Sequence, residues 1–184
     1  MSSSTHAGRK IWTTGYTRAE LDAAQERYGL VFPPDLVDLW RERRLVDGCD
    51  WRTDEEAIRE RLAWPFEGLL FDVEHDALWW AEWGERPPSA PERAEVLREV
   101  VSAAPKLIPL YSHRYLPAEP HEAVNPVFSV YQSDVIYYGV DLADYFLREF
   151  DDSVPMSPRS PKRIRFWSDM VERNGTPDAY RPEG

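Results

Sequence analysis

The first third of the chain carries apolar residues at helical spacing, and this pattern predicts three helices. The first covers residues 17–28 and begins with a Thr-x-x-Glu capping box. The second, residues 33–47, opens at a Pro-Pro pair and is expected to stop at the Asp-Gly that ends it. The third, residues 53–64, begins with another capping box and is expected to halt before Pro65.

The centre of the chain has a weaker pattern. Leu69–Asp72 is predicted as a short strand, and His75–Trp80 as a turn or a second short strand. Residues 83–91 are rich in proline and small residues and are expected to form a loop. Helical spacing then returns over Pro91–Ala103.

Strand-like segments follow. Lys106–Ser112 is predicted as a strand, and Pro109 within it indicates an edge strand or a bulge, because proline cannot donate to the ladder. A further short extended piece follows it. Val127–Tyr131 and Val135–Tyr138 are rich in β-branched and aromatic residues and are separated by a tight polar turn, so they predict an antiparallel hairpin. The hairpin and the next helix are expected to supply core through Val127, Phe128, Val130, Val135, Ile136, Leu142 and Phe146.

The last elements complete the predicted fold. Asp141 can cap a helix, and residues 164–175 are expected to form a final short one. Helices first, strands in the middle and a helix after them predict a single α+β domain, with a mainly antiparallel sheet packed against several helices. This domain is expected to cover residues 17–173, with a flexible N-terminal tail at 1–16 and a C-terminal tail at 174–184.

The charge is negative and unevenly distributed. The formal net charge is −11, and residues 63–157 hold 17 acidic residues but only 6 basic ones. Such a surface repels phosphate backbones and attracts basic partners, so we expect no direct binding to nucleic acid. The alternative is that the acidity only maintains solubility.

Cysteine usage and hydropathy limit the class of protein further. Cys49 is the only cysteine, so neither an intramolecular disulfide nor a multi-cysteine zinc site can form. The N-terminus lacks the apolar stretch of a signal peptide, and no window approaches the ~18 consecutive apolar residues of a membrane span. We therefore expect a cytoplasmic protein that does not bind membranes.

Motifs for a chemical reaction are lacking. The chain has no GxSxG, no phosphate-binding P-loop and no GxGxxG that opens a helix. The acidic run from Asp72 to Asp76 could in principle hold a divalent cation, but it lacks the glycine and the oxygen-ligand spacing of a calcium loop. We expect no metal, no cofactor and no enzymatic activity, while a hydrolase that uses two carboxylates stays open as an alternative.

Two clusters could instead contact a partner. Trp80 and Trp83 lie in a run of three tryptophans, a residue type favoured at binding hot spots, although two of the three could complete the core. Arg114 and Tyr115 combine charge and aromatic surface at the end of a strand. An ion pair from Arg114 to Asp134 or Asp141 is the alternative explanation for the arginine.

Several motifs together resemble the SUKH superfamily. They are the Phe-Pro-Pro start of the second helix, LIPLYSHRYLP, NPVFSVYQSDVIYYGVDLADYFLREF and the late IRFWSDMVE, and the resemblance covers Thr17 to Glu172. The superfamily includes fungal regulators of cell-wall synthesis and bacterial immunity proteins of polymorphic toxin systems. The chain departs from it in the Leu-Val-Asp-Gly that ends at Gly48, where an Asn-Gly-like turn is usual, and in the Trp-rich insertion before Pro87.

The resemblance implies a protein-binding domain without a reaction or a cofactor. The leading hypothesis is an immunity protein that neutralises a basic toxin domain by stoichiometric binding as a monomer or weak dimer, with a nuclease as one candidate toxin. A regulatory or scaffolding domain is the alternative. The candidate contact residues are Asp72, Glu74, Asp76, Trp80, Trp83, Arg114, Tyr115 and Gln132.

Overall fold

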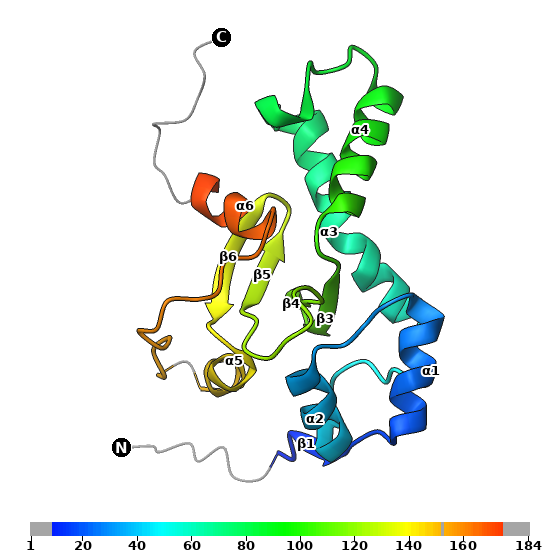
Figure 1. The fold of residues 1–184 in the computed structure, drawn as a ribbon, viewed down its shortest axis with the longest axis vertical. Helices are drawn as coiled ribbons and strands as arrows, with labels where there is room; N and C mark the ends of the chain where they lie inside the picture. The colour runs from blue at the N-terminus through cyan, green and yellow to red at the C-terminus, as the bar shows by residue number, and fades with distance from the viewer. Residues whose placement is uncertain (1–8, 152, 175–184) are drawn as a thin grey trace.

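The computed structural model describes residues 9–151 and 153–174, and Figure 1 shows the arrangement of its helices and strands. The helices are α1 (Arg18–Tyr28), α2 (Pro34–Glu42), α3 (Glu55–His75), the short 3₁₀ helix η1 (Ala81–Trp83), α4 (Ala90–Ala103), α5 (Leu142–Glu149) and α6 (Trp167–Asn174). The strands are β1 (Trp12–Thr14), β2 (Arg43–Leu45), β3 (Leu107–Tyr111), β4 (Arg114–Pro117), β5 (Val127–Tyr131) and β6 (Asp134–Gly139). These elements form a single α+β domain, which confirms the predicted fold class.

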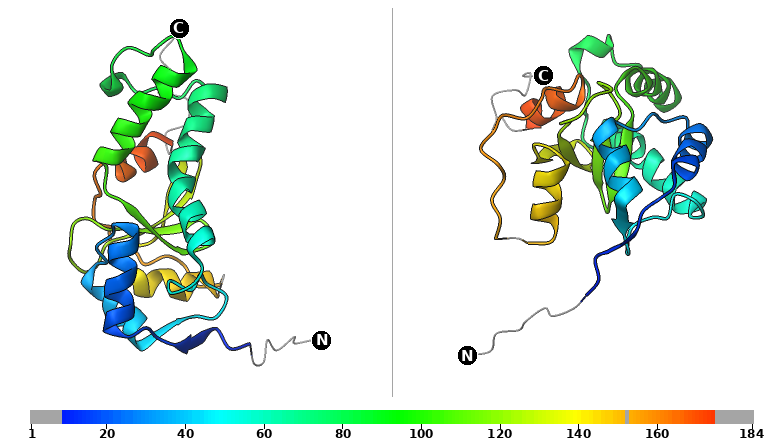
Figure 2. Two further views of the ribbon diagram at one scale, coloured as in Figure 1. Left: turned by 90° about the vertical axis from the view of Figure 1, so that its right-hand side faces the viewer. Right: turned by 60° about the horizontal axis from the view of Figure 1, so that its bottom comes forward.

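The main sheet is antiparallel, with its four strands in the order β3-β4-β5-β6. Each face of this sheet packs into a different hydrophobic core, because successive side chains of a strand point to opposite sides of the sheet. One core joins Phe128 and Val130 of β5 to α3, α4 and α6. The other joins Ile108 and Leu116 of β3 and β4 to α1, α2 and α5. Helices therefore cover both faces, and α3 and α4 extend side by side beyond the sheet (Figures 1 and 2).

The predicted hairpin and its flanking elements are confirmed. β5 and β6 pair through a two-residue turn, with Tyr131 opposite Asp134. β3 is an edge strand with a register shift between Pro109 and Tyr111, as the proline indicated. The Asp141 side chain caps α5 by accepting a hydrogen bond from the Asp144 N–H at 2.8 Å.

The predicted core of the hairpin holds except at one position. Val127, Phe128, Val130, Val135 and Leu142 are buried, and Phe146 is partly buried against them. Ile136, in contrast, is 48 % exposed. It lies opposite Ser129 on the sheet face that α5 covers only in part, so strand alternation turns it outward.

The largest correction concerns α3, which runs through Pro65 to His75. The predicted strand Leu69–Asp72 is therefore helical. Proline at position 65 removes the N–H that would bond to the Arg61 carbonyl four residues earlier. The Tyr115 hydroxyl takes its place and donates to that carbonyl at 2.7 Å. A bond from a distant strand thus satisfies the group that proline leaves free, and the helix continues.

The capping box predicted for the third helix does not form. The residue before α3 is Asp54, whose side chain makes no cap bond within the helix and instead accepts the Asp50 N–H at 2.8 Å. This hydrogen bond therefore links two residues of the loop before α3, and the first turn of α3 has no side-chain cap.

The second predicted helix ends earlier than expected. α2 stops at Glu42, and residues 43–45 form β2, which pairs with β1 in the segment predicted as an N-terminal tail. Gly15 allows this pairing, because a Cβ there would lie 2.5 Å from the carbonyl oxygens of Trp40 and Arg41. Apart from Asn174, the predicted C-terminal tail lies outside the described residues, as do residues 1–8.

No helix within residues 9–151 and 153–174 combines the length and the apolar character needed to cross a membrane.

Candidate protein-binding surfaces

The predicted contact residues do not form one surface. Tyr115 is 1 % exposed, and burial raises the pKa of its hydroxyl, which donates to the Arg61 carbonyl of α3. Arg114 lies on the opposite face of the sheet from Phe128, with its guanidinium 3.9 Å from the centre of the Tyr138 ring. Its carboxylate partner is Glu149 of α5, at 3.3 Å, rather than Asp134 or Asp141. Both residues hold the fold together.

The tryptophans pack against the core beside α6. Trp79, Trp80 and Trp83 are all partly buried, and the Trp80 and Trp83 rings lie 5.2 Å apart. The Arg173 guanidinium lies 3.9 Å from the centre of the Trp80 ring and pairs with Glu82. This arrangement supports the alternative that these side chains complete a core between η1 and α6.

Glu74 joins two helices. Its carboxylate accepts two hydrogen bonds from the Arg93 guanidinium of α4, both 2.8 Å long. These bonds hold the pKa of Glu74 below its usual value. The bidentate geometry fixes α4 against α3.

Asp72 ties α3 to the tip of the β5–β6 hairpin. It is 4 % exposed, and its Oδ2 accepts the Ser133 N–H at 2.8 Å. Asp76 lies one turn further along, where interaction with the Asp72 carboxylate raises its pKa. Gln132, at the same tip, has a φ of 55°, the left-handed region that residues other than glycine adopt infrequently. The structure therefore places Asp72 beside the hairpin tip that carries Gln132, with Asp76 one turn further along α3, and the other predicted residues lie elsewhere.

Around this tip lies an exposed surface that the sequence reasoning missed. Trp64, Phe71 and Tyr131 are 38 %, 48 % and 52 % exposed. The Trp64 indole N–H donates to the Val130 carbonyl at 2.9 Å, and its ring lies 5.8 Å from that of Tyr131. Exposed carboxylates stand between these aromatic side chains along α3 and on the hairpin. We call this surface the α3 ridge; it consists of Glu60, Trp64, Glu67, Phe71, Tyr131 and Asp134.

Helical geometry explains the ridge. Glu60, Trp64, Glu67 and Phe71 are spaced by three or four residues, so they share one face of α3. Gly68 lets the hairpin approach beside them, because a Cβ at this position would lie 2.9 Å from the Gln132 Cα. The spacing is visible in the sequence, but only if the helix is continued past Pro65.

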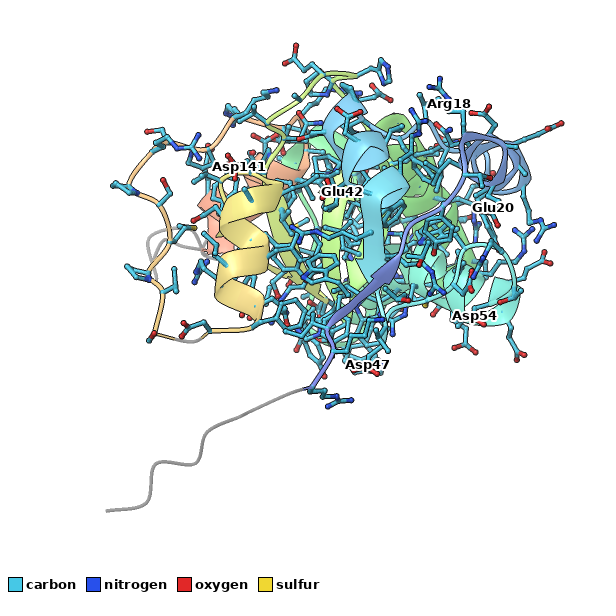
Figure 3. The ribbon with its side chains drawn as sticks, turned by 90° about the horizontal axis from the view of Figure 1, so that it is seen from below. Arg18, Glu20, Glu42, Asp47, Asp54 and Asp141 are labelled. Atoms are coloured by element: carbon cyan, nitrogen blue, oxygen red, sulfur yellow. The ribbon has the colours of Figure 1, made fainter. Side chains whose placement is uncertain are left out.

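A second exposed apolar surface lies between α5, α2 and β1. It is a groove of about 720 Å³. Ile11, Val124, Leu147 and Phe150 line it and are 37 %, 46 %, 61 % and 40 % exposed. We call it the apolar groove. Figure 3 looks onto this side of the molecule, with Asp141 at the end of α5 and Glu42 on the neighbouring α2.

Groups suited to catalysis or metal binding are sparse among the described residues. No three His, Cys, Asp or Glu side chains within this part of the chain gather where a metal ion could be held. Burial raises the pKa of the Cys49 thiol, which lowers its thiolate fraction and hence its reactivity. Interaction with Asp72 raises the pKa of Asp76, but this carboxyl lies at an exposed helix end rather than in a cavity.

Comparison of the chain with family models, with curated proteins and with solved structures gives no match.

Proposed function

We propose that this chain is a non-enzymatic protein-binding domain that neutralises a basic toxin domain by stoichiometric binding. The observation that carries the proposal is the α3 ridge, which exposes three aromatic side chains among carboxylates. Tryptophan and tyrosine are enriched at binding hot spots, because they bury a large apolar area and keep a polar group for hydrogen bonding. The resemblance to SUKH immunity proteins supports the same class of function.

The charge of the ridge indicates the partner. Glu60, Glu67 and Asp134 are exposed, and the whole chain has a net charge of −11. An acidic surface accelerates association with a basic one and disfavours acidic competitors. Against a nuclease, these carboxylates would occupy positions that nucleic-acid phosphates otherwise take. The partner is therefore expected to present lysines or arginines around an apolar pocket.

The ridge is also large and well fixed. Its helical part, from Glu60 to Phe71, is about 17 Å long at 1.5 Å per residue. The Asp72 bond to Ser133 and the Trp64 bond to Val130 hold the hairpin beside it. A surface that is already ordered loses little conformational entropy on binding, which favours affinity.

The test is co-expression with the toxin candidate encoded in the adjacent gene. We expect growth to be rescued and the two proteins to co-purify as a one-to-one complex. The double variant Trp64→Ala/Phe71→Ala should weaken binding at least tenfold, since each hot-spot truncation costs about 2 kcal/mol. The matched control is Val31→Ala/Val46→Ala, which truncates two exposed side chains outside the ridge.

The outcomes separate the alternatives. Failure both to rescue growth and to bind the neighbouring gene product would refute toxin neutralisation. Binding without rescue would favour a regulatory or scaffolding role. Equal affinities for the ridge variant and its control would show that another surface binds. No observation favours the hydrolase, because Asp76, whose pKa the neighbouring Asp72 raises, is exposed at the end of α3.

A further inference from the structure

The apolar groove has a floor of packed side chains from two helices and a strand. Leu39 of α2, Leu142 and Phe146 of α5 and Trp12 of β1 all line it. The rings of Trp12 and Phe146 meet edge to face, with their centres 5.0 Å apart. The floor is therefore continuous with the core, and the exposed side chains above it form the sides of the groove.

One side of the groove is a loop held in an unusual conformation. Val124 has a φ of 70°, an outlier for a β-branched residue. Its N–H donates to the Asp35 carboxylate at 3.0 Å, and the Lys162 ammonium donates to the neighbouring Ala123 carbonyl at 2.9 Å. Strained backbone persists where the surroundings fix it, and such positions often lie at binding sites. These bonds keep the Val124 side chain in the groove rather than in the core.

The border of the groove is acidic. Among its lining residues, Asp35, Asp141 and Asp151 supply three carboxylates, and Arg43 is the one guanidinium. The Arg43 guanidinium lies 4.4 Å from the centre of the Trp12 ring. Asp141 forms an ion pair with Arg159 at 2.7 Å. Asp35 and Asp151 accept hydrogen bonds only from backbone N–H groups and from a serine hydroxyl among the described residues, and no described cationic side chain pairs with them. A cationic occupant fits this border.

A second copy of the chain fits poorly. In a symmetric dimer across the groove, the same acidic border would face itself, and each copy brings a net charge of −11. An extended peptide would have to pair with the free edge of a sheet, and the strands at the groove, β1 and β2, have only three residues each, whereas α2 and α5 supply six of the lining side chains. A helix that places an apolar stripe between two other helices meets the geometry.

We propose that the apolar groove binds an amphipathic helix of a partner protein, with lysines or arginines on both sides of the helix's apolar stripe. Leu147 and Phe150 contact the stripe, and Asp35 and Asp151 face the cations. This site shares no residue with the α3 ridge and goes beyond the toxin neutralisation proposed above. The protein would thus hold two partner segments, or two parts of one partner, at once.

The test uses three synthetic 18-residue peptides and the full chain. The first has leucines at helical i, i+3, i+4 and i+7 spacing with lysines on both flanks. The second replaces every lysine by glutamate, and the third scrambles the first so that the leucine stripe is lost. Fluorescence anisotropy of labelled peptide measures each affinity. We expect the first to bind at least tenfold more tightly than either of the others.

Variants then locate the site. Leu147→Ser should weaken binding of the lysine peptide at least fivefold, about the loss that marks a contributing interface residue. Leu147 is 61 % exposed, so this change should leave the fold intact. The matched control is Ile136→Ser, which alters a side chain 48 % exposed outside the groove and should leave the affinity unchanged. The ridge variant Trp64→Ala/Phe71→Ala should also bind the peptide normally.

Several results would overturn the proposal. Equal binding of the lysine and glutamate peptides, or of the scrambled one, would do so, as would an affinity indifferent to Leu147→Ser. Loss of peptide binding in the ridge variant would place the peptide on the α3 ridge instead. A dimer in sedimentation that Leu147→Ser dissociates would assign the groove to a second copy of the chain. Failure of toxin rescue alone would leave these peptide results standing, so the two proposals fail separately.

Discussion

Replacement of Gly68 by alanine tests the contact that positions the α3 ridge. A Cβ on Gly68 would lie 2.9 Å from the Gln132 Cα and 3.1 Å from the Gln132 backbone N. Non-bonded carbon atoms prefer about 3.5–4.0 Å. Because the obstacle is backbone, no side-chain rotation can relieve it, and either the helix or the hairpin must move by several tenths of an ångström.

Two effects oppose each other in this variant. Alanine is favoured over glycine in a helix interior by about 1 kcal/mol. Overpacking of a well-filled contact costs about 1–3 kcal/mol. Retreat of the hairpin would also stretch the hydrogen bonds from Ser133 to Asp72 and from Trp64 to Val130, each of which contributes about 1 kcal/mol net. The steric cost should therefore win, and we expect Gly68→Ala to lower the free energy of unfolding by about 1–2 kcal/mol.

Urea unfolding followed by tryptophan fluorescence measures this change. The control is Glu95→Ala, on the exposed face of α4, which should stay within about 0.5 kcal/mol of the parent. A Gly68→Ala variant as stable as the parent, or more stable, would refute the reasoning. It would show that the higher helix propensity of alanine outweighs the steric cost of its Cβ at position 68, and that the hairpin is not held rigidly against α3.

Three other substitutions test the core and the charges. Trp167→Ala removes a side chain 1 % exposed and should cost about 3–5 kcal/mol in urea unfolding. Interaction with Asp72 raises the pKa of Asp76 above 3.8, so the folded state favours its protonated form and loses stability as the pH rises through that range. Asp76→Asn should therefore raise the melting temperature at pH 7, with a gain that fades below about pH 4. The hydrogen bond from Arg52 lowers the pKa of Asp50 from 3.8 to about 2, so its stabilisation is full above pH 4 and is lost toward pH 2. Asp50→Asn should lower the melting temperature at pH 7 and lose this effect as the pH approaches 2.

The elements that were predictable depend on neighbours in the sequence. The β5–β6 hairpin has β-branched and aromatic strands on either side of a two-residue turn, and the cap on α1 lies within its first four residues. β1 could not be found in the same way, because its partner Leu45 is 33 positions from Trp12. No local pattern specifies a pair of three-residue strands at that separation.

The α3 ridge was missed for a related reason. Proline normally ends a helix, but α3 continues past Pro65, where Tyr115, distant in sequence, supplies the missing donor to the Arg61 carbonyl. Ending the helix there hid the spacing that joins Trp64 to Phe71. The acidic residues Asp72 and Asp76 were found because composition alone marks them. Whether an individual charge is free or already paired, as Glu74 is with Arg93, depends on tertiary contacts that composition does not contain.

Pro65, Tyr115 and Gly68 together explain why the ridge suits a binding surface. Tyr115 fixes the middle of α3 to the sheet, and Gly68 brings the hairpin tip within contact distance of the same helix. Both residues are buried or partly buried, so neither needs to touch a partner to influence binding. The exposed side chains Trp64 and Phe71 can then act as anchors on a support that does not have to reorganise. Under the proposed function, affinity would come from these anchors, and the surrounding carboxylates would mainly set the association rate and the choice of partner.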